Sequence, residues 1–291
     1  MIIIVIIMMK NKLTVFILTH GRADDVITYK TLRKCNYTGD IYIIIDNEDN
    51  QIDRYKEIYG DKVIVFNKLE MSKKFDTADN FNDRRTIVYA RNACFEIAES
   101  LGIEYFIELD DDYTGFTYRF NELGEFKQKP IKNLDKILDL LMDFYKNTPF
   151  NSIAMSQGGD FIGGNNNHFV DLLWNRRKCM NTIICSTKRK YKFVGRINED
   201  VNTYTSQQRL GLLFTTIPQI SMNQKTTQKN KGGMTDVYLE NGTYVKSFYS
   251  VIFNPSSVKI FLLPGTNRRL HHCISWKKTI PALISCKYKK G

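Results

Sequence analysis

The stretch Tyr105-Phe-Ile-Glu-Leu-Asp-Asp-Asp112 joins an apolar segment directly to three carboxylates. Its aromatic and branched residues predict a strand over 105–109 that the aspartates end. In an open α/β sheet, ligands bind beyond the carboxyl ends of the strands. The stretch therefore predicts such a sheet, with a ligand site where this strand ends.

The spacing of the aspartates predicts a metal site. Alternate residues on an extended chain share a face, so we expect Asp110 and Asp112 to point at one site and Asp111 elsewhere. Adjacent acids repel one another, and a divalent cation is the usual compensation. This DxD arrangement offers hard oxygen ligands to Mg²⁺ or Mn²⁺ and leaves coordination positions for diphosphate oxygens. The alternative is a solvated acidic turn, against which the buried strand argues.

The residues before this stretch alternate strand and helix patterns, as a parallel sheet with crossover helices requires. Strands are predicted at 13–18, 41–45 and 63–66, and helices at 24–34, 53–59 and 84–101. The last helix carries apolar residues at spacings of three and four and ends at Gly102. Together they predict a Rossmann-like, mostly parallel sheet.

The second half has a more mixed pattern. Helices are predicted at 133–146 and 201–210, strands at 152–155, 182–185 and 212–216, and a mobile basic loop at 223–233. Residues 256–291 form a basic ending. The length of the chain fits one large domain or two small ones.

The composition fits a compact chain of 291 residues. There are 42 Lys and Arg against 31 Asp and Glu, a net charge of +11 that excludes an acidic solvating tail. Six cysteines without a CxxC pair indicate buried thiols in a reducing, cytosolic compartment. The apolar run Met1–Met9 is too short to cross a bilayer, so no membrane partner is expected. Three interpretations stay open for this run: an extension ahead of a true start at Met8 or Met9, an extra strand, or a weak anchor to a membrane surface.

Further polar residues lie where strands and helices meet. Asp46 ends a strand and either binds a base or ribose or makes an ordinary turn, and His20 either reaches the same ligand or caps a helix. Asp200, with Glu199 as the second choice, precedes a helix and either acts as a base or caps backbone amides. His271 and His272 either complete the metal site or form a surface pair.

Arg84 and Arg91 are seven residues apart, two turns of the predicted helix, so they are expected on one side of it. A guanidinium fork suits phosphate oxygens. The alternative is an exposed charged helix face.

Taken together, these residues resemble a glycosyltransferase of the GT-A fold. The resemblance rests on the order of Thr19-His20-Gly21-Arg22, Asp46, Arg91-Asn92, Asp110 to Asp112, Glu199-Asp200 and a late His. The segments LDDDY (109–113), MSQGGD (155–160) and GRINEDV (195–201), with the basic ending, are similar to the TET/JBP-associated glycosyltransferases of phages. That family is thought to add sugars to hydroxymethylated pyrimidines in DNA.

The resemblance implies a donor-binding half over 13–112 and an acceptor-binding and catalytic half over 113–291 within one GT-A domain. It implies a UDP-sugar donor, Mn²⁺ or Mg²⁺ as cofactor, Asp200 as base, and a host-cytoplasmic location if a phage encodes the chain. The metal ligands implied are Asp110, Asp112, His271 and His272. The donor-binding residues implied are Thr19, His20, Arg22, Asp46, Arg84, Arg91, Asn92, Asp110, Asp111 and Lys277.

A DNA acceptor also fits the net charge, because Lys and Arg neutralise phosphates, although an AT-biased genome alone enriches Lys. Trp174 or Phe161 is a candidate to stack on a flipped base. The predicted acceptor residues are Trp174, Arg176, Arg177, Gly158 and Gly159, with further candidate cations at Lys178, Lys188, Arg189, Lys190, Lys225, Lys229 and Lys231.

Other functions remain open from sequence. A nucleotidyltransferase normally has a Gly-rich loop after its first strand, and this chain lacks one. A metal-dependent nuclease could use the acidic residues, but that function would not explain Asp46 and Arg91-Asn92. The serious rival is a GT-A glycosyltransferase with a glycan or other non-DNA acceptor. A catalytically silent nucleic-acid-binding module is the alternative from another class.

Overall fold

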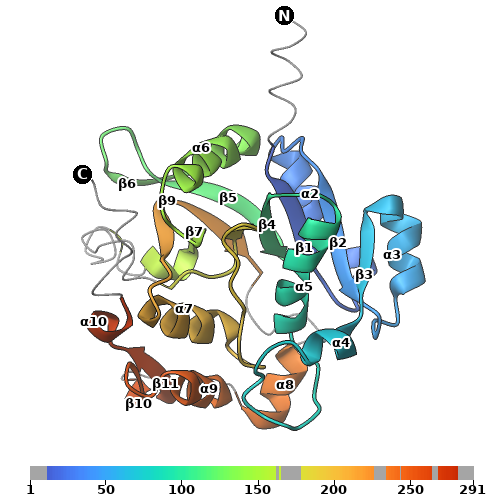
Figure 1. The fold of residues 1–291 in the computed structure, drawn as a ribbon. Helices are drawn as coiled ribbons and strands as arrows, with labels where there is room; N and C mark the ends of the chain where they lie inside the picture. The colour runs from blue at the N-terminus through green and yellow to red at the C-terminus, as the bar shows by residue number, and fades with distance from the viewer. Residues whose placement is uncertain are drawn as a thin grey trace, which may run out of the picture.

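The computed structural model describes residues 12–161, 164, 178–225, 234–242, 244–263 and 268–280 (Figure 1). The strands of its main sheet are β1 (Thr14–Leu18), β2 (Ile41–Asp46), β3 (Val63–Phe66), β4 (Tyr105–Asp110), β5 (Tyr113–Phe120), β6 (Phe126–Pro130), β7 (Ser152–Gln157), β8 (Ile183–Ser186) and β9 (Phe214–Gln224). Their order across the sheet is β3-β2-β1-β4-β8-β7-β9-β5-β6.

The first four strands run in parallel. β1 pairs with β2 and β4, and β2 pairs with β3. Leu18 at the end of β1 is in register with Ile44 and with Asp110, so the residues after β1, β2 and β4 leave the sheet at one edge. Beyond β4 the sheet is mixed: β8 is antiparallel to β4 and β7, β7 and β9 are parallel, and β5 is antiparallel to β9 and β6.

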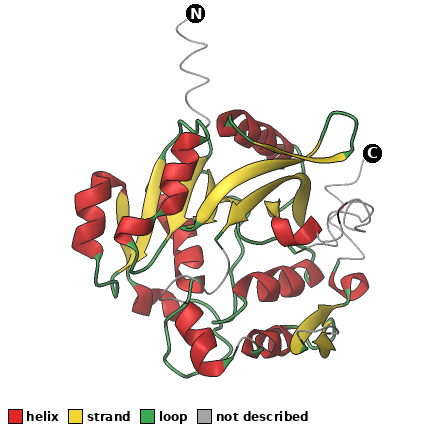
Figure 2. Ribbon diagram, turned by 180° about the vertical axis from the view of Figure 1, so that it is seen from behind, coloured by secondary structure: helices red, strands yellow, loops and turns green. Residues whose placement is uncertain are grey.

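Helices cover both faces of the sheet (Figures 1 and 2). One face carries α2 (Ile27–Lys34) and α6 (Leu134–Lys146), with α3 (Ile52–Tyr59) near the β3 edge. The other carries α4 (Lys68–Ser72), α5 (Val88–Ser100) and α7 (Glu199–Arg209). Beyond α7 lie α8 (Met234–Asn241), α9 (Val245–Phe253), the hairpin of β10 (Val258–Leu263) and β11 (Arg269–Ile274), and α10 (Trp276–Thr279).

The two cores follow from the period of two along each strand. Val15 and Ile17 of β1 enter the core under α2 and α6, whereas Phe16 and Leu18 enter the core under α5 and α7. A third, small cluster joins Ile197 to Val237 of α8 and Tyr249 of α9. The fold class predicted from sequence, an α/β sheet flanked by helices, is confirmed.

The helix expected from residue 84 begins at Val88. The Asp83 carboxylate accepts hydrogen bonds from the backbone N–H and side chain of Arg85, and the Thr86 N–H donates to the Arg84 carbonyl. These local bonds replace the first helical turn. Arg84 and Arg91 therefore do not share one side of a helix, and that prediction is wrong.

Several elements were not predicted: β5, β6, α4, α8, α9 and the β10–β11 hairpin. Asn223 and Gln224, expected in a loop, end the long strand β9, and residues 226–233 lie outside the described part. Residues 1–11, including the apolar run, also lie outside it.

Five cysteines are described and all are free thiols, with Cys273 exposed and the other four buried. Within the described ranges, every helix is too short or too polar to span a membrane.

Candidate active site

The site begins where β4 ends. Asp110 and Asp112 lie at the carboxyl edge that β4 shares with β1 and β2. Burial, followed by the charges of Asp110 and Asp111, raises the pKa of Asp112 to about 7. Burial also raises the pKa of Asp110, against the lowering effect of Arg91. Two carboxylates are thus held together at an energetic disadvantage that a bound cation would relieve.

Asp111 has different partners. It is 3% exposed, accepts a 2.6 Å hydrogen bond from Thr19 Oγ1 and forms a salt bridge of 2.9 Å with Arg22. Thr19 also bonds the Tyr55 hydroxyl, which accepts the backbone N–H of Arg22. Asp111 therefore fixes the loop after β1 against the end of β4. The predicted donor-binding residues Thr19 and Arg22 are both bonded to Asp111.

A buried arginine connects the acids beneath this edge. Arg91 of α5 is 2% exposed and contacts Glu199 at 2.9 Å, Asp110 at 3.1 Å and Glu108 at 3.4 Å. Burial opposes the charge of Arg91, yet Asp110, Glu199 and Glu108 together raise its pKa well above the ordinary value. Arg91 was predicted as a phosphate contact, whereas its described bonds go to protein carboxylates.

The two glutamates of this network are strongly perturbed. Burial, only partly offset by Arg91, raises the pKa of Glu108 to about 8. Burial and then the neighbouring Asp200 raise the pKa of Glu199 to about 7. Glu108 Oε1 is buried and has no hydrogen-bond partner among the described residues. At neutral pH the network therefore holds protons that exposed carboxyl groups would have released.

Asn92, predicted beside the donor, makes structural hydrogen bonds. Its Oδ1 accepts the Phe193 N–H at 2.9 Å, and its Nδ2 donates to the Phe193 carbonyl at 2.9 Å and the Val88 carbonyl at 3.2 Å. α5 thereby positions the chain that leads into the acid pair of α7.

Glu199 and Asp200 form the first turn of α7, where the positive end of the helix favours negative charge. Asn198 precedes them in the left-handed conformation, with φ 62°. Its Nδ2 donates to Ser250 Oγ of α9, and Ser250 Oγ donates to Asn202 Oδ1. Asp200 Oδ1 accepts the Val201 N–H at 2.7 Å. The position of Glu199 and Asp200 is thus fixed by contacts with α9 as well as by α7 itself.

A cavity of about 300 Å³ opens beside this edge, at the ends of β1, β2 and β3. His20 Nδ1 lies 2.8 Å and Lys68 Nζ 3.1 Å from Asp46 Oδ2, and Glu48 pairs with Arg84 at 2.7 Å. Burial tends to raise the pKa of Asp46, but His20 and Lys68 outweigh it and keep the pKa low. The lining combines cationic and hydrogen-bonding groups: His20, Glu48, Lys68, Asn82, Asp83, Arg84 and Arg85.

One wall of this cavity is tied to the C-terminal elements. Arg196, 5% exposed, contacts Asp79 at 2.8 Å, Asp83 at 2.9 Å and the Tyr249 hydroxyl of α9 at 2.9 Å. The backbone N–H of Arg196 also donates to the Thr77 carbonyl. The segment between α4 and α5 is therefore held against α9.

The predicted histidine ligands lie on β11. In the described ranges, no group of three or more His, Cys, Asp or Glu side chains is arranged to hold a metal ion. His271 and His272 are therefore not grouped with the aspartates as predicted. Asp110 and Asp112 alone still fit Mg²⁺ or Mn²⁺, because such ions commonly take one or two carboxylates and complete their coordination with substrate phosphates and water.

The remaining predicted residues are scattered. Lys277 is exposed on α10, and Gly158 and Gly159 are exposed at the end of β7. Phe161 is buried, with the Arg119 guanidinium 4.6 Å from its ring centroid. Trp174, Arg176, Arg177, Lys229 and Lys231 lie outside the described residues.

The basic run 188–190 lies far from the acidic edge. Lys188 pairs with Glu104 at 2.9 Å, Lys190 with Glu99, and Arg189 donates to carbonyls at the end of α6. Glu104 precedes β4 and Asp110 ends it, a separation of roughly 20 Å along a strand. These three cations therefore do not line the site, and Lys225 pairs with Asp25.

Sequence reasoning missed Glu108, Lys68 and Lys246. Glu108 had a readable signal, since a carboxylate inside an apolar strand lies on the same face as Asp110. Lys68 follows an ordinary β3 end, and Lys246 is near Asp200 only through the packing of α9.

A family model described as TET-Associated Glycosyltransferase matches residues 13–233. Among solved structures, the chain is similar to glucosyl-3-phosphoglycerate synthase from Mycobacterium tuberculosis in complex with Mn²⁺, uridine diphosphate and phosphoglyceric acid. That match covers 91% of this chain and 87% of the other, with 8% sequence identity and a TM-score of 0.45. No curated protein matches the chain.

Proposed function

Because the chain belongs to the TET-associated glycosyltransferase family, we propose that it transfers a sugar from a UDP-sugar to a hydroxymethylated pyrimidine in DNA. Sugar transfer follows from the family. The observation that supports the site is the convergence of Asp110, Asp112, Glu199 and Asp200 at the carboxyl edge of the parallel strands.

The donor nucleotide is assigned to the cavity beside this edge. His20, Lys68 and Arg84 offer positive or hydrogen-bonding groups, and Asp46 holds two of them in place. Asp110 and Asp112 would hold Mn²⁺ or Mg²⁺. When bound, such an ion neutralises charge on the departing diphosphate.

Asp200 is the proposed base. It takes the proton of the acceptor hydroxyl, the oxygen forms a bond to the anomeric carbon, and the bond from that carbon to the diphosphate breaks with its electron pair leaving on the diphosphate. Direct attack inverts the anomeric carbon. Glu199 is less suited because Arg91 holds one of its oxygens at 2.9 Å.

The DNA acceptor is supported by the family and by the net charge of +11, since cationic side chains release counterions from phosphates. A cytoplasmic location agrees with five free described thiols.

The first test is metal-dependent hydrolysis of UDP-sugars. We expect turnover with Mn²⁺ or Mg²⁺ and a decrease of at least about 100-fold in Asp112→Asn, because electrostatic groups at a leaving group commonly contribute that much. Asp139→Asn, an exposed carboxylate on α6, is the matched control. Equal rates in both variants would contradict the metal assignment.

The second test decides the acceptor. A radiolabelled donor is incubated with DNA that contains 5-hydroxymethylcytosine, 5-hydroxymethyluracil or neither. Label is expected only in hydroxymethylated DNA. Transfer to a glycan or to protein, with none to DNA, rejects the proposed acceptor and leaves sugar transfer intact.

A further inference from the structure

A group of positively charged and histidine side chains lies next to the acid pair of α7. This cationic cluster consists of Lys178, Lys246, Arg269, His271 and His272. Its members come from the segment before β8, the first turn of α9 and strand β11. Separate parts of the chain thus place like charges together, which requires an explanation.

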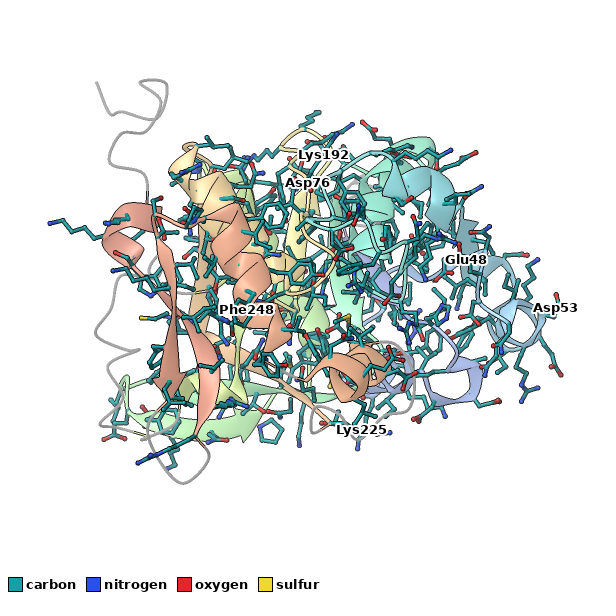
Figure 3. The ribbon with its side chains drawn as sticks, turned by 90° about the horizontal axis from the view of Figure 1, so that it is seen from below. Glu48, Asp53, Asp76, Lys192, Lys225 and Phe248 are labelled. Atoms are coloured by element: carbon teal, nitrogen blue, oxygen red, sulfur yellow. The ribbon has the colours of Figure 1, made fainter. Side chains whose placement is uncertain are left out.

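The hairpin and α9 fix the geometry of this cluster. α9 packs against both β10 and β11, and Figure 3 shows α9, marked by Phe248, beside the hairpin. The rings of His271 and His272 are 4.4 Å apart between centroids. The Nδ1 atoms of both are buried and have no hydrogen-bond partner among the described residues. Two polar atoms are therefore left for an external partner.

The charges around the cluster point to an anion. Burial lowers the pKa of Lys246, Asp200 raises it, and Arg269 and Lys178 lower it further. Burial and then His271, Lys246 and Lys178 lower the pKa of His272 to about 3. In the described ranges, Lys178, Lys246 and Arg269 form no ion pair within 4.0 Å. A metal cation at the histidines would be repelled by these neighbours, whereas a phosphate would be attracted.

We propose that the cationic cluster binds a backbone phosphate of the acceptor strand beside the target nucleotide. The proposal rests on the proposed DNA acceptor. Lys178, Lys246 and Arg269 supply charge, and the neutral histidines supply ring N–H donors. Lys246 is also the member on which the Asp200 charge acts, so a phosphate held here would bring the adjacent nucleotide toward the proposed base.

The test measures binding of a fluorescent oligonucleotide that contains 5-hydroxymethylcytosine, without donor. We expect the double variant Lys178→Gln and Lys246→Gln to bind about 10-fold more weakly and to reduce the slope of log Kd against log salt by about 1 for each phosphate that the protein no longer neutralises. Lys259→Gln, an exposed residue of the same hairpin, is the matched control and should bind as the wild type does.

Three further measurements separate the possible results. Replacing the phosphates that flank the target base by neutral methylphosphonates should weaken binding to the wild type and leave the double variant unaffected. The KM for UDP-sugar hydrolysis should stay unchanged in the double variant. The single variant Lys246→Arg, which keeps the positive charge, should bind DNA as the wild type does.

An unchanged Kd in the double variant overturns the inference and leaves the proposed function standing. A raised donor KM with unchanged DNA binding also overturns it, because the cluster then serves the donor diphosphate. If the wild type hydrolyses UDP-sugar but binds no oligonucleotide, the DNA acceptor and this site both fail while sugar transfer stands.

Discussion

At the scale of single residues, Arg91 should contribute strongly to stability. Its guanidinium lies within 3.4 Å of three carboxylates and is nearly inaccessible to water. Arg91→Met leaves these acids without their cation, and removing one partner of a buried ion pair costs about 3 to 5 kcal/mol. Urea unfolding should show that decrease, whereas Arg54→Met, which removes exposed ion pairs with Asp24 and Glu57, should leave the free energy of unfolding nearly unchanged.

Glu108 gives the protein a pH-dependent stability. Its pKa of about 8 in the folded protein exceeds the ordinary 4.5, so the folded state binds the proton more tightly than the unfolded chain. This contribution is complete below about pH 4.5 and disappears as the pH rises toward 8. Unfolding free energies measured in EDTA should therefore fall between about pH 4.5 and pH 8, and Glu108→Gln should flatten that fall. A fall as steep in the variant as in the wild type, or steeper, would reject the assignment.

The sequence predicted the placement of residues that lie at the ends of strands. Asp110 ends β4 as the strand pattern predicted, and Asp111 bonds Thr19 and Arg22 in the turn that follows. That Asp110 and Asp112 share a metal site stays a prediction. The sequence did not predict that Arg91 binds protein carboxylates or that the lysines at 188 and 190 are paired far from the site. Ion pairs depend on which distant segments meet, and that information is absent from local spacing.

At the scale of elements, the entry into α7 depends on Gly195. Its φ is +84°, and an added Cβ would lie 2.1 Å from Asn202 Nδ2 and 2.7 Å from the Phe253 ring. Gly211 also has a positive φ, +98°, but meets nothing within 4 Å. Both alanine variants carry the backbone strain, and only Gly195→Ala adds the clash. Thermal unfolding should give Gly195→Ala a free energy of unfolding about 1 to 3 kcal/mol lower than that of Gly211→Ala. Equal destabilisation of the two variants would contradict the packing described here.

Elements of the first half were predictable because each strand is a dense apolar run that a helix pattern separates from the next. β6 was missed because four of its five residues are exposed and Lys127, Gln128 and Lys129 carry no strand signal. α4 was missed because it has five residues, fewer than a periodic pattern needs. In both cases pairing or capping decides the structure. Asn67, for example, caps α4 by accepting the Glu70 N–H.

At the scale of the whole molecule, ligand binding should raise the melting temperature. Mn²⁺ and UDP each at 100 times its dissociation constant should add about 2.7 kcal/mol or more, a shift of roughly 5 °C. Asp112→Asn should abolish the shift that depends on Mn²⁺, while Asp139→Asn keeps it. A shift by UDP that needs no metal and survives in Asp112→Asn would place the nucleotide away from the aspartates.

The order of strands in the sheet has a consequence for synthesis. β5 and β6 follow β4 along the chain, yet β8, β7 and β9 separate them from it in space. On the ribosome, β4 keeps an open hydrogen-bonding edge until residues 183–186 emerge, and β5 waits for residues 214–224. The nascent chain is therefore most exposed to self-association midway through translation, when the parallel half is made and its neighbours are not.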